Sequence, residues 1–144
     1  MTVATVMTSC PACCTPSSSL TEVARLMVDN NCGEIPVVED LQSRKLAGVI
    51  TDRDIATRIV AQGRNSAEAC ALDCMTTPAL SVGTETSLQE CCELMEVQQI
   101  RRVPVVDEAG AVVGIVSLAD VVRNANTATT VAVVKEVSSG VERG

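Results

Sequence analysis

The sequence contains no phenylalanine, tyrosine, tryptophan or histidine in 144 residues. Its hydrophobic core must therefore be aliphatic, and a hydrophobic share of 47% is ordinary for a globular chain. The absence of histidine removes the commonest general base and the commonest zinc ligand. No pair of a nucleophile and a base can be named either, so we expect no catalytic residue and no enzyme.

Basic residues are scarce as well, because 11 Lys and Arg stand against 18 Asp and Glu, which gives a net charge of −7. Proteins that bind nucleic acid neutralise phosphates with clustered basic side chains, and single-strand binders also stack bases on aromatic rings. The composition therefore excludes nucleic acid as an expected partner.

Long apolar runs are missing too. No segment approaches the roughly 18 consecutive apolar residues that suggest a membrane span. The first ten residues, MTVATVMTSC, lack the basic start and the apolar run of a signal peptide. We therefore expect a cytoplasmic protein without membrane contact.

Cysteine, in contrast, occurs eight times. Without an export signal a reducing compartment is expected to keep these side chains as free thiols that act as small hydrophobic groups. A C-x-x-C pair from Cys10 to Cys13 could join Cys70 and Cys74 in a metal site, which stays an alternative. The spacing is loose and no redox fold surrounds the pair, so we expect no metal. The eight are Cys10, Cys13, Cys14, Cys32, Cys70, Cys74, Cys91 and Cys92.

The sequence repeats itself. A shift of 68 positions aligns two copies of one unit, and shortening one loop by two residues extends the match. The aligned segments are Met7-Thr8 with Met75-Thr76, Ser19-Leu20 with Ser87-Leu88, Pro36-Val37-Val38 with Pro104-Val105-Val106, Gly48-Val49-Ile50-Thr51 with Gly114-Ile115-Val116-Ser117, and Asp54 with Asp120.

Each copy is predicted to open with an amphipathic helix. Ser19 with Glu22, and Ser87 with Glu90, have the form of a capping box at the helix start. Gly33 is placed to end the first helix. The apolar residues at helical spacing in copy one are Leu20, Val23, Ala24, Met27 and Val28.

A β-hairpin and a second helix should follow. The runs IPVV and LAGVI in copy one, and VPVV and AVVGIV in copy two, are short, apolar and separated by a polar turn. Thr51 and Ser117 then start helices over residues 52–61 and 118–124. Counting a short strand after each Met-Thr pair, each copy reads β-α-β-β-α.

The expected fold is mixed α/β, with residues 1–63 as repeat one, 64–73 as a linker and 74–126 as repeat two. One repeat alone has too little core, so we expect the two to pack their sheets together about a pseudo-two-fold axis, with the helices outside. The tail at 127–144 is either an added strand or a disordered end, and both alternatives stay open.

Each copy resembles a CBS domain, the repeat also found in cystathionine β-synthase, inosine monophosphate dehydrogenase and the nucleotide-sensing subunit of AMP-activated kinase. The resemblance covers residues 6–124 and rests on three features that occur twice in the same order. These are Met-Thr, an apolar residue followed by Pro-Val-Val, and Gly with an apolar pair before Thr/Ser-x-x-Asp. The resemblance implies a stand-alone CBS pair that binds AMP, ATP, NAD or S-adenosylmethionine as a regulatory ligand, not as a cofactor, and without turnover.

By the same resemblance, Asp54 and Asp120 grip ribose hydroxyls, a role that suits a carboxylate accepting two hydrogen bonds. Thr51 and Ser117 add a hydroxyl to backbone N–H groups at the helix start, which would bind phosphate. The alternative for both motifs is a plain capping box.

The resemblance implies two clefts, each combining the Asp motif of one copy with the segment before Pro in the other. Site 1 would carry three guanidinium groups suited to an anionic ligand, with adenine between apolar side chains. Its residues are Thr51, Arg53, Asp54, Leu80, Ile100, Arg101, Arg102 and Val103. The alternative is that Arg101 and Arg102 only pair with surface carboxylates.

Site 2 should bind phosphate less well, because Glu34 adds a carboxylate and neither motif adds a basic side chain. Its residues are Ser117, Ala119, Asp120, Gly33 and Ile35. The rival interpretation of the whole chain is an association module with empty clefts. On either interpretation we expect a homodimer formed through CBS helices and a separate, unknown regulated protein.

Overall fold

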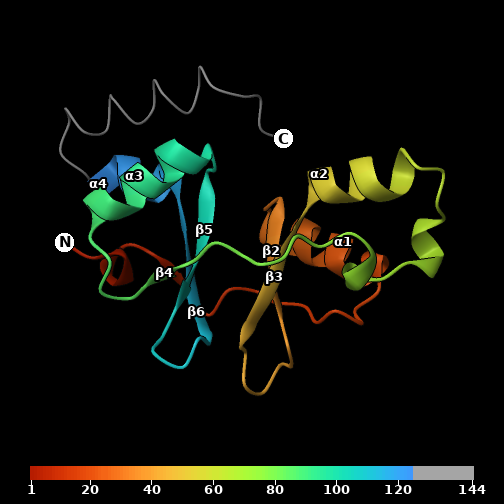
Figure 1. Cartoon of the computed structure of the whole chain (residues 1–144), viewed down its shortest axis with the longest axis horizontal. Helices are drawn as coiled ribbons and strands as arrows, with labels where there is room; N and C mark the ends of the chain where they lie inside the picture. The colour runs from red at the N-terminus through yellow and green to blue at the C-terminus, as the bar shows by residue number, and fades with distance from the viewer. Residues whose placement is uncertain (125–144) are drawn as a thin grey trace. The chain divides into compact units, whose positions relative to one another are not determined.

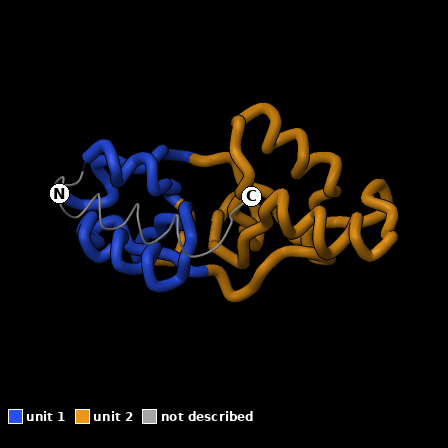
Figure 2. The backbone as a smooth tube through the Cα atoms, turned by 90° about the horizontal axis from the view of Figure 1, so that it is seen from above, with its two compact units in different colours: residues 1–10, 80–108, 113–143 blue, residues 11–79, 109–112, 144 orange. Residues whose placement is uncertain are grey.

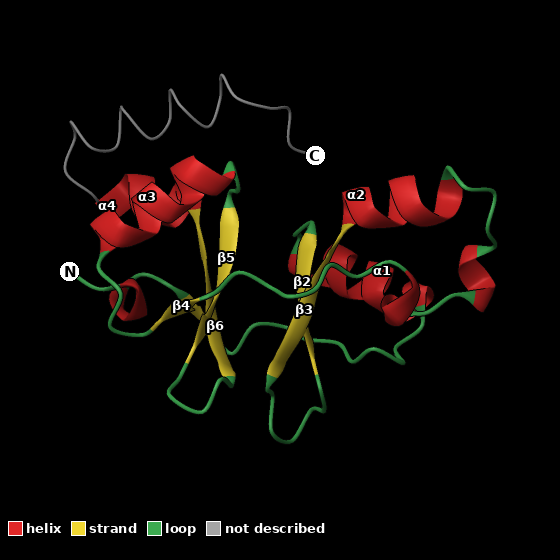
Figure 3. Cartoon of the chain, viewed as in Figure 1, coloured by secondary structure: helices red, strands yellow, loops and turns green. Residues whose placement is uncertain are grey.

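The structure, a computed structural model, describes residues 1–124, over which helices and strands alternate (Figures 1 and 3). The chain forms two compact units (Figure 2). Among the described residues, unit 1 comprises Met1–Cys10, Leu80–Glu108 and residues 113–124, and unit 2 comprises Pro11–Ala79 and Ala109–Val112. The predicted tail at 127–144 lies outside the described residues.

The element order is the one that the sequence predicts. The elements of repeat one are β1 (Thr8–Ser9), α1 (Leu20–Asn30), β2 (Glu34–Val38), β3 (Leu46–Thr51) and α2 (Asp52–Ile55), which continues as a π-helical turn, η2 (Ala56–Val60). Those of repeat two are β4 (Val82–Gly83), α3 (Leu88–Gln98), β5 (Arg102–Val106), β6 (Val112–Ser117) and α4 (Leu118–Asn124). Three short 3-10 turns complete the list: η1 (Val3–Thr5), η3 (Ser66–Glu68) and η4 (Ala71–Asp73). The mixed α/β class and the β-α-β-β-α order are therefore confirmed.

Unit 1 contains a four-stranded sheet with the order β1-β6-β5-β4. Strand β1 runs antiparallel to β6, with Thr8 opposite Ile115, and β4 runs parallel to β5, with Val82 opposite Val105. The central hairpin of β5 and β6 is thus flanked by two very short strands that come from elsewhere in the chain.

Unit 2 repeats this arrangement around the antiparallel hairpin of β2 and β3. Cys14 forms a parallel bridge to Val37, and Thr76 forms an antiparallel bridge to Val49. These two single-residue bridges occupy the positions that β4 and β1 occupy in unit 1. The two units therefore share one strand order, although unit 2 has only a two-stranded sheet by the stricter definition.

The compact units and the sequence repeats divide the chain differently. Strand β1 belongs to repeat one in sequence but pairs in the unit of repeat two, and Thr76 does the reverse. We call these two segments, β1 and residues 74–77, the exchanged segments. Each repeat thus lacks one edge of its own sheet and receives it from the other repeat.

Two glycines make room for the exchanged segments. A Cβ atom at Gly48 would lie 2.6 Å from the Thr76 carbonyl oxygen, and one at Gly114 would lie 2.8 Å from Cγ of Met7. At Gly48 the close atom is a backbone oxygen, so the neighbouring segment requires glycine there, whereas at Gly114 a Cβ would displace the Met7 side chain, which lies directly before β1. The glycine of each repeat motif is therefore a packing residue for the other repeat.

The first helix begins as predicted and ends differently. Ser19 is the N-cap of α1, and its hydroxyl accepts the Glu22 N–H at 3.1 Å. The left-handed residue at the end of α1 is Asn31, with φ of 48°, so the prediction that Gly33 ends the helix is wrong. Asparagine tolerates this conformation, and Gly33 instead gives space to the Asp52 carboxylate, whose Oδ2 would lie 2.8 Å from a Cβ there. At Ser87 both bonds of the predicted capping box are present, so that prediction is confirmed.

Each unit has its own aliphatic core. The core of unit 1 gathers Val3, Val82, Leu88, Cys91, Cys92, Met95, Val103, Val105, Val116 and Val121. The core of unit 2 gathers Cys14, Leu20, Val23, Met27, Ile35, Val37, Ile50, Ile59, Ala69, Ala71 and Cys74. Cysteine side chains fill space in both cores, which accords with their expected role as small hydrophobic groups.

Candidate functional site

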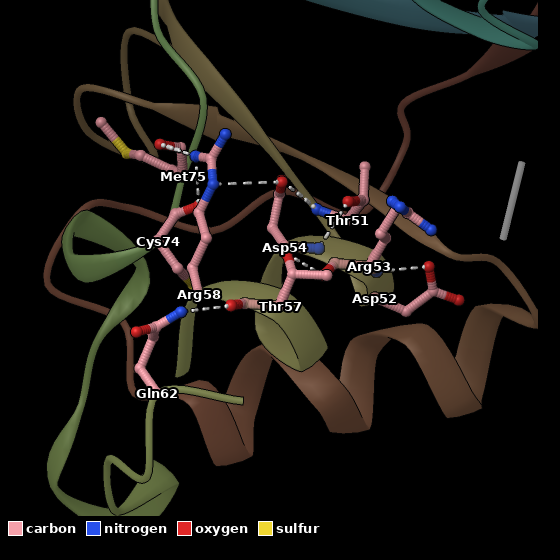
Figure 4. Close-up of polar contacts among 9 residues, drawn as sticks. All are labelled: Thr51, Asp52, Arg53, Asp54, Thr57, Arg58, Gln62, Cys74 and Met75. Carbon is pink, nitrogen blue, oxygen red and sulfur yellow. Dashed lines mark hydrogen bonds and ion pairs between the residues drawn. The ribbon is translucent and has the colours of Figure 1, made fainter. Parts of the chain in front are cut away.

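The first Thr/Ser-x-x-Asp motif lies where β3 turns into α2. Thr51 has extended backbone angles and is the N-cap of α2. Its hydroxyl accepts the Asp54 N–H at 3.0 Å, while Oδ2 of Asp54 accepts the Thr51 N–H at 3.0 Å (Figure 4). The motif is therefore a complete capping box, and it holds the Asp54 carboxylate in one orientation through one of its two oxygens.

The backbone N–H groups at this helix start already have acceptors. The Asp52 N–H donates to the Gly33 carbonyl at 2.9 Å, and the Arg53 N–H donates to Oδ1 of Asp52 at 2.8 Å. Together with the two capping-box bonds, all four N–H groups from Thr51 to Asp54 are engaged. The polar side chains of the first turn thus satisfy these donors in this structure, and a phosphate would have to displace those bonds to use them. The phosphate contact at Thr51 stays a prediction.

Arg58 approaches the second oxygen of Asp54 from the next turn. Its Nε lies 3.8 Å from Oδ1 of Asp54, and its Nη1 donates to the carbonyl oxygens of Cys74 at 3.0 Å and Met75 at 3.2 Å (Figure 4). The Asp54 side chain is 14% exposed. Sequence reasoning missed Arg58, although the i, i+4 spacing of an aspartate and an arginine on a helix was a usable signal.

The second motif has the same capping box and a different arginine. The Ser117 N–H donates to Oδ2 of Asp120 at 2.9 Å, and the Asp120 N–H donates to the Ser117 hydroxyl at 3.1 Å. The Leu118 N–H donates to the Arg101 carbonyl at 2.7 Å. Nη2 of Arg123 contacts Oδ1 of Asp120 at 2.5 Å, a direct hydrogen bond. Arg123 was not predicted either.

The remaining predicted arginines lie on the surface. Arg53 and Arg101 are exposed, and Arg102 is half-buried at the start of β5. Across residues 1–124 their guanidinium groups form no ion pair and no hydrogen bond. The alternative in which Arg101 and Arg102 pair with surface carboxylates therefore does not describe this structure.

The predicted apolar contacts differ in accessibility. Val103 and Ile35 are buried in the cores of units 1 and 2, and Ile100 packs against the core of unit 1. Leu80 is exposed. Residues of predicted site 1 occur in both units, as do those of site 2, and both sites stay predictions.

The eight cysteines carry free thiols, of which Cys14, Cys74, Cys91 and Cys92 are buried and Cys10 is exposed. Arg44 donates to Sγ of Cys13 at 3.2 Å. Within the first 124 residues, no group of three or more Cys, Asp or Glu side chains has a geometry that could hold a metal ion. The same part of the chain has no helix long and apolar enough to cross a membrane.

Burial raises the pKa of the Cys14 thiol to about 12, and likewise that of Cys91, because an apolar core disfavours the charged thiolate. An unfolded cysteine ionises near pH 8.5, so above that pH the folded chain binds more protons than the unfolded chain. We predict that the free energy of unfolding falls between about pH 9 and 12, by up to about 1.4 kcal/mol per pH unit for each thiol.

Urea denaturation at pH 8, 9 and 10 measures this slope. The control is the double variant Cys14→Ala, Cys91→Ala, which should be less stable at every pH but should lose much of the decline. An identical pH dependence of the unfolding free energy in both proteins would contradict the raised pKa values of Cys14 and Cys91.

The model of the CBS domain matches this chain twice, over residues 3–61 and 71–126. The chain belongs to the CBS-domain family. The CBS domain-containing protein YhcV of Bacillus subtilis is 42% identical over 118 residues, which make up 82% of this chain and 81% of that protein. The predicted resemblance is thereby confirmed for both repeats.

Solved CBS structures have the same fold. Hypoxic Response Protein I, crystallised with two coordinated zinc ions, superposes with a TM-score of 0.78 at 33% identity, covering 88% of this chain and 100% of that one. CBSX2 of Arabidopsis thaliana in complex with AMP gives 0.72 at 28% identity, covering 86% and 95%. The CBS domain pair of MJ0100, in complex with 5′-methylthioadenosine and S-adenosyl-L-methionine, gives 0.75 at 28% identity, covering 85% and 94%.

Proposed function

We propose that this CBS pair is a regulatory module that binds one phosphorylated adenine nucleotide, such as AMP, and releases it unchanged. The observation that carries the proposal is the state of Asp54. One oxygen of its carboxylate is fixed by the capping box, and the other has Arg58 at 3.8 Å, beyond hydrogen-bond distance. Oδ1 of Asp54 is thus oriented and retains capacity for ligand hydroxyls, as a ribose acceptor requires.

The class of ligand follows from the arginines. AMP carries a phosphate, whereas 5′-methylthioadenosine and S-adenosylmethionine do not. Arg53, Arg101 and Arg102 keep guanidinium groups without partners in residues 1–124, and guanidinium binds phosphate through paired N–H donors. These three side chains favour a nucleotide over an uncharged or cationic adenosyl compound. Because the side chain of Val103 lies in the core of unit 1, we assign the adenine contacts of site 1 to Leu80, Ile100 and the backbone at Val103.

Site 2 should be the weaker site for a second reason besides charge. Oδ1 of Asp120 already accepts a hydrogen bond from Arg123, so a ribose hydroxyl must displace that bond or share the oxygen. Ala119 stands where repeat one has Arg53, which removes a cation from this helix start. We therefore expect about one strongly bound nucleotide per chain.

Calorimetric titration with AMP, ATP, NAD and S-adenosylmethionine tests the proposal. Saturable binding of AMP near one equivalent per chain, weaker for S-adenosylmethionine and reduced at high salt, is the predicted result. Arg102→Glu should weaken AMP binding about tenfold or more while changing S-adenosylmethionine binding little. Silence across the whole panel would overturn the proposal.

The second candidate is an association module, and one observation favours it. Val28 on α1 is 78% exposed, and Val97 on α3 is 74% exposed. A large exposed apolar side chain on the first helix of each repeat suits a homodimer joined through these helices, or a docked regulated protein. The molar mass in solution tests the homodimer. A monomer mass for the wild type, unchanged in the variants Val28→Ser and Val97→Ser, would exclude it. A cytoplasmic location stays part of the proposal, and free thiols would suit such a reducing compartment.

A further inference from the structure

We infer that Arg58 is a positioning residue, which couples occupancy of Asp54 to the exchanged segment at residues 74–77. The inference rests on the proposed function, because it assigns the regulation of the same site. Every contact that supports it lies within unit 2.

Arg58 stands at an irregular point of its helix. Helix α2 gives way after one turn to the π-helical turn η2, in which the Ala61 N–H donates to the Ala56 carbonyl at 2.8 Å. π-helical turns are rare in proteins, and those that occur are often found at functional sites. Arg58 lies within this turn, and from there its side chain reaches both Asp54 and the carbonyl oxygens of Cys74 and Met75 (Figure 4).

Two sets of acceptors compete for the guanidinium group of Arg58. One set is the carbonyl pair of Cys74 and Met75, at 3.0 and 3.2 Å, and the other is Oδ1 of Asp54, at 3.8 Å. The carbonyl pair therefore holds Arg58 in its present place, and the carboxylate contact is only an ion pair.

Repeat two has a different arrangement, in which Arg123 stands three residues after Asp120, whereas Arg58 stands four residues after Asp54. Arg123 bonds directly to Oδ1 of Asp120, and in the described chain it has no backbone carbonyl as a partner. The carbonyl pair and the longer spacing of Arg58 thus leave Oδ1 of Asp54 without a direct hydrogen bond from an arginine, whereas Oδ1 of Asp120 has one.

The segment that Arg58 holds is an edge of the sheet. Immediately after Met75, the Thr76 N–H donates to the Val49 carbonyl at 2.8 Å, and the Val49 N–H donates to the Thr76 carbonyl at 3.1 Å. The backbone of Thr76 in this bridge packs against Gly48, and the Thr76 carbonyl oxygen is the atom nearest to a Cβ placed at Gly48. Fixing the two carbonyls before Thr76 therefore supports the docking of the exchanged segment.

Ligand occupancy should strengthen this support. A ribose hydroxyl that donates to Oδ1 of Asp54 takes up the acceptor that otherwise attracts Arg58, so Arg58 stays on the carbonyls of Cys74 and Met75. Thermodynamic linkage makes this effect reciprocal. When residues 74–77 are docked and hold Arg58 on their carbonyls, Oδ1 of Asp54 is free to accept a ligand hydroxyl, so docking of the segment raises the affinity for ligand. The coupled pair of Arg58 and residues 74–77 is thus a route from the nucleotide to the backbone of the other repeat.

Amide hydrogen exchange at Thr76, compared with Val38, measures the coupling. The Val38 N–H donates to the Cys14 carbonyl at 2.8 Å and lies on the other side of the hairpin, so it reports general stabilisation of unit 2. The test variant is Arg58→Met, which keeps the length and apolar stem of the side chain, and the matched control is Arg123→Met.

Without nucleotide, Arg58→Met should speed exchange at Thr76 about tenfold relative to Val38, since two hydrogen bonds near the bridge are lost, and Arg123→Met should not. With saturating AMP, the wild type should slow exchange at Thr76 relative to Val38 severalfold, and Arg58→Met should abolish this difference.

An unchanged ratio of Thr76 to Val38 exchange in nucleotide-free Arg58→Met overturns the inference, as does a full AMP effect in that variant. Absence of AMP binding to the wild type, seen by calorimetry, rejects the proposed function instead. The nucleotide-free comparison then still decides whether Arg58 holds the segment.

Discussion

Asp54→Asn is expected to weaken AMP binding about 10- to 100-fold, whereas Asp120→Asn should change it by less than about threefold. The estimate is the contribution of a hydrogen bond to a charged acceptor, about 1.5–3 kcal/mol. Asparagine keeps an oxygen for the Thr51 N–H, which donates to Oδ2 of Asp54 at 3.0 Å in the wild type, so helix α2 should still be capped. The loss of affinity then reports the carboxylate and not an unfolded helix start.

Calorimetry on the two variants gives the comparison directly, with the thermal midpoint as a check on folding. Ala substitutions at the same places should keep the rank order, with an added loss of stability from the missing cap. Equal losses of affinity from Asp54 and Asp120 would contradict the asymmetry of the two sites, even if nucleotide binding itself is real.

Gly48→Ala is expected to destabilise the fold by about 1–3 kcal/mol, the typical range for an overpacked buried site. The added Cβ would lie 2.6 Å from the Thr76 carbonyl oxygen and 2.9 Å from a methyl carbon of Thr77. The first of these is backbone in a hydrogen-bonded bridge, which cannot move aside cheaply. Either the bridge between Thr76 and Val49 opens, or β3 is displaced.

Gly83→Ala is the matched control for this change. Gly83 also lies in a short strand, but a Cβ there meets only the Thr86 hydroxyl oxygen at 3.8 Å, an ordinary contact. Urea denaturation of both variants should show a large loss for Gly48 and a change within about 0.5 kcal/mol for Gly83. Similar stabilities of the two variants would contradict the close contact between Gly48 and the Thr76 backbone.

Periodicity and repetition predicted most of the fold. The hairpins and both helices of each repeat occur where the apolar runs and helix starts placed them, because these are local signals. The end of α1 was misplaced because two residues compatible with a left-handed backbone, Asn31 and Gly33, stand close together, and only the position of Asp52 shows what Gly33 is for.

The exchange of first segments between the repeats could not be predicted from one sequence, because a two-residue strand carries too little pattern to choose its partner. Gly48 and Gly114 were recognised as parts of a motif, but the contact that requires them is made by residues from the other repeat. Long-range pairings of this kind depend on the packing of the whole unit.

The site was predicted in part. Thr51 and Asp54 were found from the motif, and the capping box that had been the plainer alternative coexists with an open carboxylate oxygen. The sequence did not show that the backbone N–H groups at the start of α2 already have acceptors. In particular, no sequence pattern indicates that the Asp52 carboxylate accepts the N–H of the next residue, Arg53. The i, i+4 spacing from Asp54 was a signal for Arg58, but its hydrogen bonds to two carbonyls sixteen and seventeen residues away, from a π-helical turn, have no sequence signature.

The most direct test of nucleotide binding at the start of α2 is an NMR titration with AMP that follows the backbone amides of Thr51, Asp54, Ser117 and Asp120. We predict saturable shifts at Thr51 and Asp54 at lower AMP concentrations than at Ser117 and Asp120, with a stoichiometry near one per chain. Shifts confined to the second pair, or none at any of the four amides, would contradict the assignment of Asp54 as the ribose acceptor of a nucleotide-binding CBS pair.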